Sequence, residues 1–359
     1  MRIAGIRRTI AVLLAGCAIG VVLYQHSSVA TAAEQEGPKY KVDASWPKEL
    51  PNNWVMGQVG GMAVDRHDHI WVLQRPGQNT VDEVGAAQTP PESQCCFATP
   101  PVLVFDAQGN LLQSWGGPGE GFDWPKREHG IYVDKDDNVW ISGAGPGDRQ
   151  ILKFKSDGHF LMEIGHPSTD SANSTRTDIL GLPAGMEVDA DTHEIYIADG
   201  YLNKRVVVYD TDTGAFKRGW GAYGIPLSEV DNAPAPAHDP SNPTPKQFRG
   251  PVHCVQISKD GFVYVCDRGG DRIQVFTKQG KFVKEFLVAN QTLERGSAGS
   301  VNFSADPQQK YIFISDIMNN VVWMLSRDNG AVVGKIGHAG HQRYQQHLGQ
   351  LERRHLDDY

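Results

Sequence analysis

Two histidines occupy the same position relative to a following strand in two different parts of the chain. His129 lies 14 positions before Gly143 and His253 lies 14 positions before Asp267, and each of these later residues closes or follows a short apolar strand. Side chains at one register of a repeated unit point in the same direction, so imidazoles from two copies can converge. Imidazole nitrogen is a preferred ligand of zinc. The spacing predicts a metal site at His129 and His253, with two unrelated rim histidines as the alternative.

Three further side chains could act on a substrate bound beside that metal. Arg75, Tyr201 and Arg268 each come one or two positions after an apolar strand ends, which places them on the same face of the molecule. A pair of guanidinium groups suits an anionic substrate, and a tyrosine near a metal can lose its proton and act as a base. Ordinary surface residues in loops are the alternative. Six other histidines lie in predicted turns or loops and are expected to be solvated: His67, His69, His159, His166, His193 and His238.

A unit repeated five times must position these residues. Each copy has a second strand (70–73, 139–141, 195–199, 263–267 and 312–316) and a third strand (102–105, 151–154, 206–209, 273–276 and 322–325). A glycine follows each third strand and supplies the turn to a fourth. Such a four-stranded antiparallel sheet cannot bury both of its faces alone, and radial stacking of copies solves this. The repeats therefore predict an all-β fold, a β-propeller spanning residues 40–337.

The five units leave one blade of a six-bladed propeller unexplained. Residues 338–359 are polar and carry no strand-like alternation, so we expect an irregular tail and a sixth blade that is truncated or altered. The alternative is a ring of five blades closed with help from an N-terminal strand near residues 40–42. Long insertions at 117–128, 166–183 and 222–251 are expected to be loops on the propeller faces, where binding residues commonly lie.

The N-terminus has the pattern of a targeting segment. Three arginines in the first eight residues precede an apolar run at 9–24, and Ala30-Thr31-Ala32 resembles a cleavage site. We predict a signal peptide at 1–33, or an uncleaved anchor, and therefore a periplasmic or secreted protein. Leu14-Ala15-Gly16-Cys17 resembles a lipobox, although the apolar run continues past Cys17. Membrane attachment is expected only through an uncleaved or lipidated N-terminus.

Charge and cysteine content limit the partners. The net charge of −8 is a poor match for nucleic acid, which selects faces rich in lysine and arginine. We expect a monomer that acts on a small peptide or small molecule. Four cysteines follow the targeting segment: Cys95, Cys96, Cys254 and Cys266. An oxidising compartment permits disulfides, but the sequence leaves the pairing open.

Several segments together resemble one known family of propellers. The chain resembles peptidyl-α-hydroxyglycine α-amidating lyase, a six-bladed propeller of the NHL type, across residues 45–337. The segments that carry the likeness are 57–65, 128–131, 198–206, 252–253 and 267–274. Asp199-Gly200-Tyr201 and the Asp267-Arg268 segment are the most specific of them. The resemblance implies a lyase that splits a peptide ending in α-hydroxyglycine into a peptide amide and glyoxylate.

The resemblance also implies roles for individual residues. In this family three histidines hold zinc, a tyrosine is the base and two arginines stabilise charge on the substrate. The matching motifs assign two zinc ligands to His129 and His253, the base to Tyr201, and the arginines to Arg75 and Arg268. The family also carries a structural calcium ion, held largely by backbone oxygens, which the motifs do not place.

The family's third zinc histidine opens the sixth blade, which is the blade not recognised here. His338, His341 and His347 are candidate replacements without a strand context. Two other functions therefore compete with the lyase. One is a non-catalytic NHL-repeat propeller that binds a peptide, glycan or protein. The other is a gluconolactonase-type calcium propeller, which needs carboxylate and asparagine ligands at its centre.

Overall fold

The computed structural model describes residues 37–171, 173–241 and 245–337. The predicted signal peptide at 1–33, the tail at 338–359 and the three candidate histidines within that tail lie outside these residues. Within the described ranges, no helix has the length and apolar character needed to cross a membrane.

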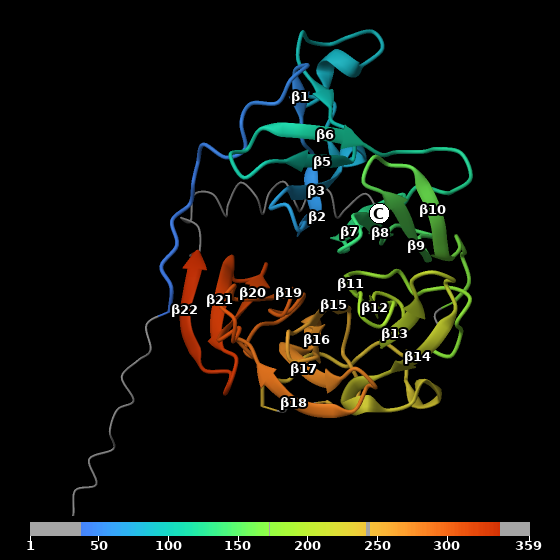
Figure 1. The fold of residues 1–359 in the computed structure, drawn as a ribbon, viewed down its shortest axis with the longest axis vertical. Coiled ribbons are helices and arrows are strands. Elements are labelled where there is room, and N and C mark those ends of the chain that lie inside the picture. The colour runs from blue at the N-terminus through green and yellow to red at the C-terminus, as the bar shows by residue number, and fades with distance from the viewer. Residues whose placement is uncertain (1–36, 172, 242–244, 338–359) are drawn as a thin grey trace, which may run out of the picture. The chain divides into compact units, whose positions relative to one another are not determined.

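Five four-stranded antiparallel sheets make up the described fold, so the predicted all-β propeller is confirmed, with five blades. Figure 1 shows the sheets around a common centre, with β2, β7, β11, β15 and β19 innermost. Blade one contains β2 (Gln58–Val64), β3 (Ile70–Arg75), β5 (Val102–Phe105) and β6 (Leu111–Trp115). Blade two contains β7 (Glu128–Val133), β8 (Asn138–Gly143), β9 (Gln150–Lys155) and β10 (Phe160–Gly165). Blade three contains β11 (Met186–Asp189), β12 (Glu194–Asp199), β13 (Arg205–Asp210) and β14 (Phe216–Trp220).

Blade four contains β15 (Val252–Ile257), β16 (Phe262–Asp267), β17 (Arg272–Thr277) and β18 (Phe282–Leu287). Blade five contains β19 (Ser300–Phe303), β20 (Tyr311–Asp316), β21 (Val321–Ser326) and β22 (Val332–Gly337). The insertion between β3 and β5 carries β4 (Phe97–Ala98), which pairs in parallel with β1 (Trp54–Val55) from the segment before β2. Short 3-10 turns lie at η1 (Pro76–Gln78), η2 (Gly85–Ala87), η3 (Ala222–Gly224), η4 (Leu227–Glu229) and η5 (Arg268–Gly270).

Apolar layers between successive blades hold the sheets together. The strands β8 and β12 are buried along their whole length because a neighbouring blade covers each face. Trp71 of blade one packs with Ile141 and Phe154 of blade two, and Val206 and Val263 belong to the layer between blades three and four. Each such side chain contributes roughly 1.5–3 kcal/mol when it leaves water. The core is therefore divided into layers, which explains why each repeat needs its neighbours.

The side of the ring between blade five and blade one differs from the others. Val59, Met62 and Val64 of β2 remain 46%, 58% and 62% exposed, although β2 is an inner strand. Residues 37–50 run from blade five to blade one along this side (Figure 1). Tyr40 contacts Phe313 of blade five, with ring centroids 5.8 Å apart, and the Lys48 amide donates to the Gly109 carbonyl of blade one at 2.9 Å. This segment forms no strand at residues 40–42, so ring closure by an N-terminal strand is wrong.

Two disulfides settle the pairing that the sequence left open. Cys254 and Cys266 lie directly opposite each other on β15 and β16 and are joined. Cys95 pairs with its neighbour Cys96 in the insertion of blade one. The first of these bonds links the strand that begins beside His253 to the strand that ends at Asp267.

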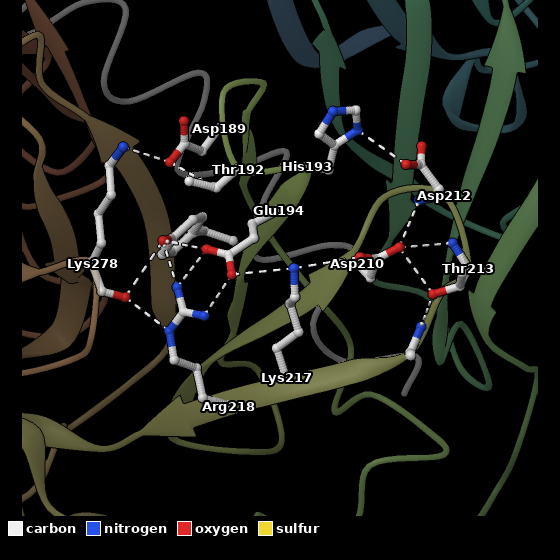
Figure 2. A network of polar contacts seen from close by, with 12 residues as sticks. Asp189, Thr192, His193, Glu194, Asp210, Asp212, Thr213, Lys217, Arg218 and Lys278 are labelled. Atoms are coloured by element: carbon white, nitrogen blue, oxygen red, sulfur yellow. Dashed lines mark hydrogen bonds and ion pairs between the residues drawn. The ribbon is translucent and has the colours of Figure 1, made fainter.

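A group of paired charges ties blade three to blade four, and we call it the blade-three charge network: Asp189, Glu194, Asp210, Lys217, Arg218 and Lys278. Arg218 Nη2 lies 2.6 Å from Glu194 Oε2, and Lys278 Nζ lies 2.5 Å from Asp189 Oδ2 (Figure 2). Lys217 Nζ lies 3.4 Å from both Glu194 and Asp210. Hydrogen bonding to Arg218 lowers the pKa of Glu194 to about 2. Every cation of this network has a carboxylate partner.

Candidate functional site

His129 and His253 stand at equivalent breaks in the pairing of two inner strands. On β7, Glu128 pairs with Gly143 and Gly130 pairs with Ser142, so His129 is the extra residue of a bulge. On β15, Val252 pairs with Asp267 and Cys254 pairs with Cys266, so His253 occupies the same place. A bulge leaves its extra residue unpaired and re-aims its side chain. The common spacing of 14 residues thus reflects a common register.

Glycines at this register of the other blades make room for the two histidine strands. A Cβ on Gly60 of blade one would lie 2.8 Å from the Glu128 carbonyl oxygen. A Cβ on Gly185 of blade three would lie 3.1 Å from the carbonyl oxygen of His253, whose strand is already hydrogen-bonded to the Gly185 amide at 3.1 Å. Imidazoles on blades two and four therefore alternate with glycines on blades one and three.

Both imidazoles meet at the phenol of Tyr201. His129 Nε2 lies 2.9 Å and His253 Nε2 lies 3.1 Å from Tyr201 Oη. The two imidazole centroids are 5.0 Å apart, and each ring is edge-on to the tyrosine ring. The structure thus brings together the two predicted metal ligands and the predicted base, from blades two, three and four.

The hydrogen bond on the far side of His253 sets the protons of this cluster. His253 Nδ1 lies 2.6 Å from the Gly299 carbonyl oxygen, which can only accept, so Nδ1 carries a proton. Burial lowers the pKa of His253 to about 4, with a further contribution from the Arg268 cation, and the ring is neutral at pH 7. Its Nε2 therefore presents a lone pair and accepts from the Tyr201 hydroxyl. A metal-binding histidine is oriented in the same way by its outer nitrogen.

His129 completes the arrangement as a second neutral ring. Burial lowers the pKa of His129 well below its usual value, and charge on His253 lowers it further. With the Tyr201 proton directed to His253, the phenol oxygen accepts from His129 Nε2 and from Arg268 Nη1, which lies 3.3 Å away. The Arg268 guanidinium carbon also lies 5.6 Å from the centroid of the Tyr201 ring. The phenol oxygen thus lies within hydrogen-bonding distance of both imidazoles and of one guanidinium group.

Buried ion pairs at the bases of two loops hold Tyr201 and Arg268 in place. Asp199 ends β12 and Arg205 begins β13, and their side chains pair at 2.7 Å with no exposure to solvent. Asp267 and Arg272 form the same contact between β16 and β17 at 2.9 Å, also fully buried. Tyr201 lies between the first two residues and Arg268 between the second two. Removing one partner of such a pair leaves a buried charge uncompensated, at a cost of about 3–5 kcal/mol.

Arg75 is fixed to the strand that carries His129. Its Nε donates to the Glu128 carbonyl oxygen at 2.6 Å, and its Nη1 donates to the Gln58 amide oxygen. Burial lowers the pKa of the Arg75 guanidinium, but the ordinary value of this group is so high that it remains a cation. Its charge is close enough to depress the pKa of His129. Arg75 therefore contributes to the field of the cluster, while Arg268 contacts the phenol directly.

The amino-acid sequence of the chain is similar to that of several known proteins. No family model matches the chain. Mouse NHL repeat-containing protein 3 is 27% identical over 307 residues, which are 83% of this chain and 73% of that protein. Peptidyl-glycine alpha-amidating monooxygenase B of Xenopus laevis is 28% identical over 257 residues, which are 68% of this chain and 25% of that protein. Peptidyl-alpha-hydroxyglycine alpha-amidating lyase 1 of Drosophila melanogaster is 25% identical over 260 residues, 69% of this chain and 42% of that protein.

The chain is a five-bladed propeller related to NHL repeat-containing protein 3 and to the amidating lyases. The predicted resemblance is thus confirmed at modest identity. The chain spans about a quarter of the amidating monooxygenase and less than half of the fly lyase. Among solved structures, a chain of the nidogen/laminin complex aligns over 78% of this chain with a TM-score of 0.48 and 13% identity.

The donor atoms at this site fit zinc at two positions. Two imidazoles aim their Nε2 atoms at one point, and with the proton of each ring on Nδ1 both atoms would offer a lone pair to zinc. A catalytic zinc ion needs three protein ligands. The described residues contain no group of three or more histidine, cysteine, aspartate or glutamate side chains able to hold a metal ion. His129 and His253 are thus two candidate ligands, and a third is not found among the described residues.

An axial cavity adjoins the two histidines. It has a volume of about 690 Å³ and is lined by the inner strands of all five blades. Glycines form much of its wall near His129 and His253, and Tyr132, Gln256 and Asn302 also line it. The cavity gives a small ligand access to the imidazoles.

Sequence reasoning missed two groups near the cluster and misjudged one histidine. The Gly299 carbonyl orients His253, but a backbone acceptor leaves no mark in a sequence. Arg127 lowers the pKa of His129 through its charge, and its position directly before Glu128-His129 was the available signal. His238 is buried rather than solvated, so that expectation is wrong.

Proposed function

We propose that this chain is a metal-dependent lyase that cleaves peptidyl-α-hydroxyglycine to a peptide amide and glyoxylate, or carries out a closely related C–N cleavage. One observation carries the proposal. The Nε2 atoms of His129 and His253 converge on Tyr201 Oη, with Arg268 on the same oxygen. Several relatives are named as amidating enzymes of this kind.

The reaction is a proton transfer coupled to cleavage of one bond. Tyr201 acts as the base only after its own proton has left, as a phenolate: the substrate hydroxyl then gives its proton to Tyr201 Oη, and the electrons of that O–H bond form the carbonyl of glyoxylate. The C–N bond breaks, its electrons pass to nitrogen, and nitrogen takes up one proton. One proton leaves and one is added, so no oxidant or reductant is required. Positioned proton transfer of this kind contributes about 10²–10⁴-fold to a rate.

Charge around the phenol suits both the base and an anionic substrate. Arg268 Nη1 lies 3.3 Å from Tyr201 Oη, so a cation faces the oxygen proposed to take the substrate proton. Arg75 and Arg268 supply cations for the carboxylate of the α-hydroxyglycine, which arginine binds well because its donors match the two oxygens. The carboxylate becomes that of glyoxylate and keeps its charge throughout, so this binding positions the substrate.

A zinc ion held by His129 and His253 would act as a Lewis acid on the substrate oxygen and lower the cost of removing its proton. The third protein ligand is a prediction that falls on residues outside the described ranges, His338, His341 or His347. The structural calcium ion of the family likewise stays a prediction.

We also propose an exported, monomeric enzyme with a small peptide substrate, in the periplasm or outside the cell. The Cys254–Cys266 disulfide supports an oxidising compartment, since such bonds are rare where thiols are kept reduced. The acidic composition supports a partner other than nucleic acid.

The test uses the purified full-length chain, zinc and a peptide ending in α-hydroxyglycine, with glyoxylate as the readout. We expect zinc-dependent glyoxylate release that is lost in His253→Ala and kept in His193→Ala. His193 is a matched control because it pairs with Asp212 on the surface at 3.0 Å. Equal, background-level glyoxylate from the wild type and His253→Ala would exclude the lyase activity.

A non-catalytic peptide-binding propeller is the second candidate. It is favoured by the presence of only two histidine ligands among the described residues and by the exposed side chains of Met62 and Val64. For a binder, Tyr201→Phe leaves peptide affinity unchanged and no glyoxylate appears. The gluconolactonase-type calcium propeller is less favoured, because the described lining of the axial cavity includes Asn302 but no aspartate or glutamate.

A further inference from the structure

We propose that His238 is a positioning residue, which holds the turn that carries Arg268 through a buried contact with Asp271. Its effect on substrate binding rests on the proposed function, whereas its effect on the turn does not. His238 belongs to the long segment between blades three and four, 30 positions before Arg268 in the sequence. It makes no contact with the substrate site itself.

The contact between His238 and Asp271 is enclosed. The His238 side chain is 5% exposed and the Asp271 side chain is 0% exposed, and Nε2 lies 3.3 Å from Oδ2. The same Nε2 lies 2.9 Å from the Asn290 carbonyl oxygen. Because a carbonyl can only accept, Nε2 carries the proton and donates it to Asn290, and Asp271 Oδ2 lies beside the same N–H group. A histidine on a solvent-exposed loop would have at least one of these partners replaced by water.

Asp271 depends on this histidine for one of its two oxygens. Its Oδ1 accepts from the Ser297 amide at 2.7 Å, but its buried Oδ2 has no hydrogen-bond partner within normal geometry. His238 Nε2 is the polar group facing that oxygen. A buried carboxylate oxygen is costly to leave without a donor. Burial raises the pKa of this carboxyl, and the His238 N–H group is the polar group that faces its unpartnered oxygen.

Asp271 in turn closes the turn that carries Arg268. It follows η5 in the left-handed conformation, with φ at 50°. Its amide donates to the Arg268 carbonyl oxygen at 3.2 Å, and its own carbonyl accepts from the Val288 amide at 2.8 Å. Such a conformation persists in a residue other than glycine where its surroundings hold it in place. The contacts of the Asp271 side chain with Ser297 and His238 help to keep this residue in that conformation.

A second contact from the same segment supports the turn. Arg249 Nε donates to the Gly269 carbonyl oxygen at 2.7 Å, and its Nη1 donates to the Pro236 carbonyl oxygen. Arg268 Nε is held by the Arg295 carbonyl oxygen at 3.0 Å, which leaves Nη1 directed at Tyr201. His238 and Arg249 thus hold the residues that directly follow Arg268, at Asp271 and Gly269, and the Arg268 guanidinium reaches the phenol from this turn.

The consequence for the reaction is specific. If the turn loosens, Arg268 still carries its charge but is held less often at 3.3 Å from Tyr201 Oη. The imidazole pair is untouched, because β7 and β15, and not this turn, carry the two rings. We expect a rise in KM of roughly tenfold, a smaller fall in kcat and unchanged zinc content.

Three variants test this inference: His238→Ala, His238→Gln and His193→Ala. Glutamine keeps an N–H donor near the place of Nε2 and should rescue most of the loss. His193→Ala removes a histidine from a histidine–aspartate pair of similar length whose side chains are more than 60% exposed, so it controls for loss of any such pair. Each variant is measured for hydrogen exchange at residues 267–272, thermal stability, zinc content, and KM and kcat.

We expect amide exchange at residues 267–272 to become several-fold faster in His238→Ala alone, together with the rise in KM. Unchanged exchange there in His238→Ala overturns the inference, as does a loss that His238→Gln does not restore. If the wild type releases no glyoxylate, the proposed function fails, and the exchange measurement still decides whether His238 holds the turn.

Discussion

Two polar regions of the propeller resemble each other in composition and differ in how their charges are matched. The blade-three charge network joins Arg218, Lys217 and Lys278 to three carboxylates at 2.5–3.4 Å. The cluster at Tyr201 also contains cationic groups, Arg75 and Arg268, but their hydrogen bonds go to backbone carbonyls, an amide oxygen and a phenol. The first region is complete without a ligand. In the second, the cations lack carboxylate partners in these hydrogen bonds, and we propose that this charge binds an anionic substrate and that the imidazoles bind a metal ion.

The largest difference between the regions should appear on removing the phenol oxygen. Tyr201→Phe keeps the ring in contact with both imidazoles but removes the atom that accepts the substrate proton. We expect glyoxylate release to fall by about 10²–10⁴-fold, with zinc content and thermal stability nearly unchanged. A variant that keeps more than a tenth of the wild-type rate would contradict the role of Tyr201 as the base.

Removing one arginine from each region should separate binding from stability. Arg268→Ala should lower kcat/KM by roughly 10²-fold with little loss of stability, since its partners are neutral. Arg218→Ala should cost about 1–3 kcal/mol of unfolding free energy, because it leaves Glu194 without its bidentate partner. Its kcat/KM should match that of the wild type. The comparison fails if the two variants show the same pattern of kinetics and urea denaturation.

The two regions should lose stability in different ranges of pH. In metal-free protein the folded pKa of His253, about 4, lies below the ordinary value of 6.5, so the unfolded chain binds more protons between these values. Its contribution, on the order of 3 kcal/mol, is present above pH 6.5 and is lost as the pH falls towards 4.

Glu194, with a folded pKa of about 2, stabilises the fold above pH 4.5 and loses that contribution as the pH falls towards 2. Urea denaturation from pH 7.5 to pH 3 on the wild type, His253→Gln and Glu194→Gln checks both ranges. His253→Gln should flatten the curve between pH 6.5 and pH 4, and Glu194→Gln should flatten it only below pH 4.5. A curve unaffected by either change would show that the regions do not titrate as described.

The smallest effect should come from crowding the strand of His253. Gly185→Ala adds a Cβ 3.1 Å from the His253 carbonyl oxygen, so β15 must shift by a few tenths of an ångström. We expect zinc affinity to fall only a few-fold and stability by about 1 kcal/mol. Gly77→Ala is the matched control, because no heavy atom lies within 4 Å of the added Cβ. Equal zinc affinity in both variants would remove the proposed role of Gly185.

The sequence predicted the parts of this site that follow the repeat. His129 and His253 were recognisable because the spacing between the first and second strands is the same in blades two and four. Tyr201 and Arg268 were recognisable because Asp199 and Asp267 mark the ends of equivalent strands. Because the spacing within each repeat is the same, residues at equivalent positions point in the same direction. These positions could therefore be predicted without knowledge of tertiary contacts.

The parts that were not predicted depend on contacts between segments without periodicity. His238 lies among prolines and small polar residues, which suggested a solvated loop, and only the fold brings it to Asp271. The difference between Arg75 and Arg268 is also tertiary, since one reaches a carbonyl oxygen and the other the phenol. The disulfide partners likewise became known only from the register of β15 and β16.

The most direct measurement is a zinc titration by calorimetry of the wild type, His129→Ala, His253→Ala and the double variant. If both imidazoles hold one ion, the wild type binds one zinc per chain, and each single variant loses nearly as much binding free energy as the double variant. Zinc binding of equal affinity in the wild type and the double variant would contradict the account.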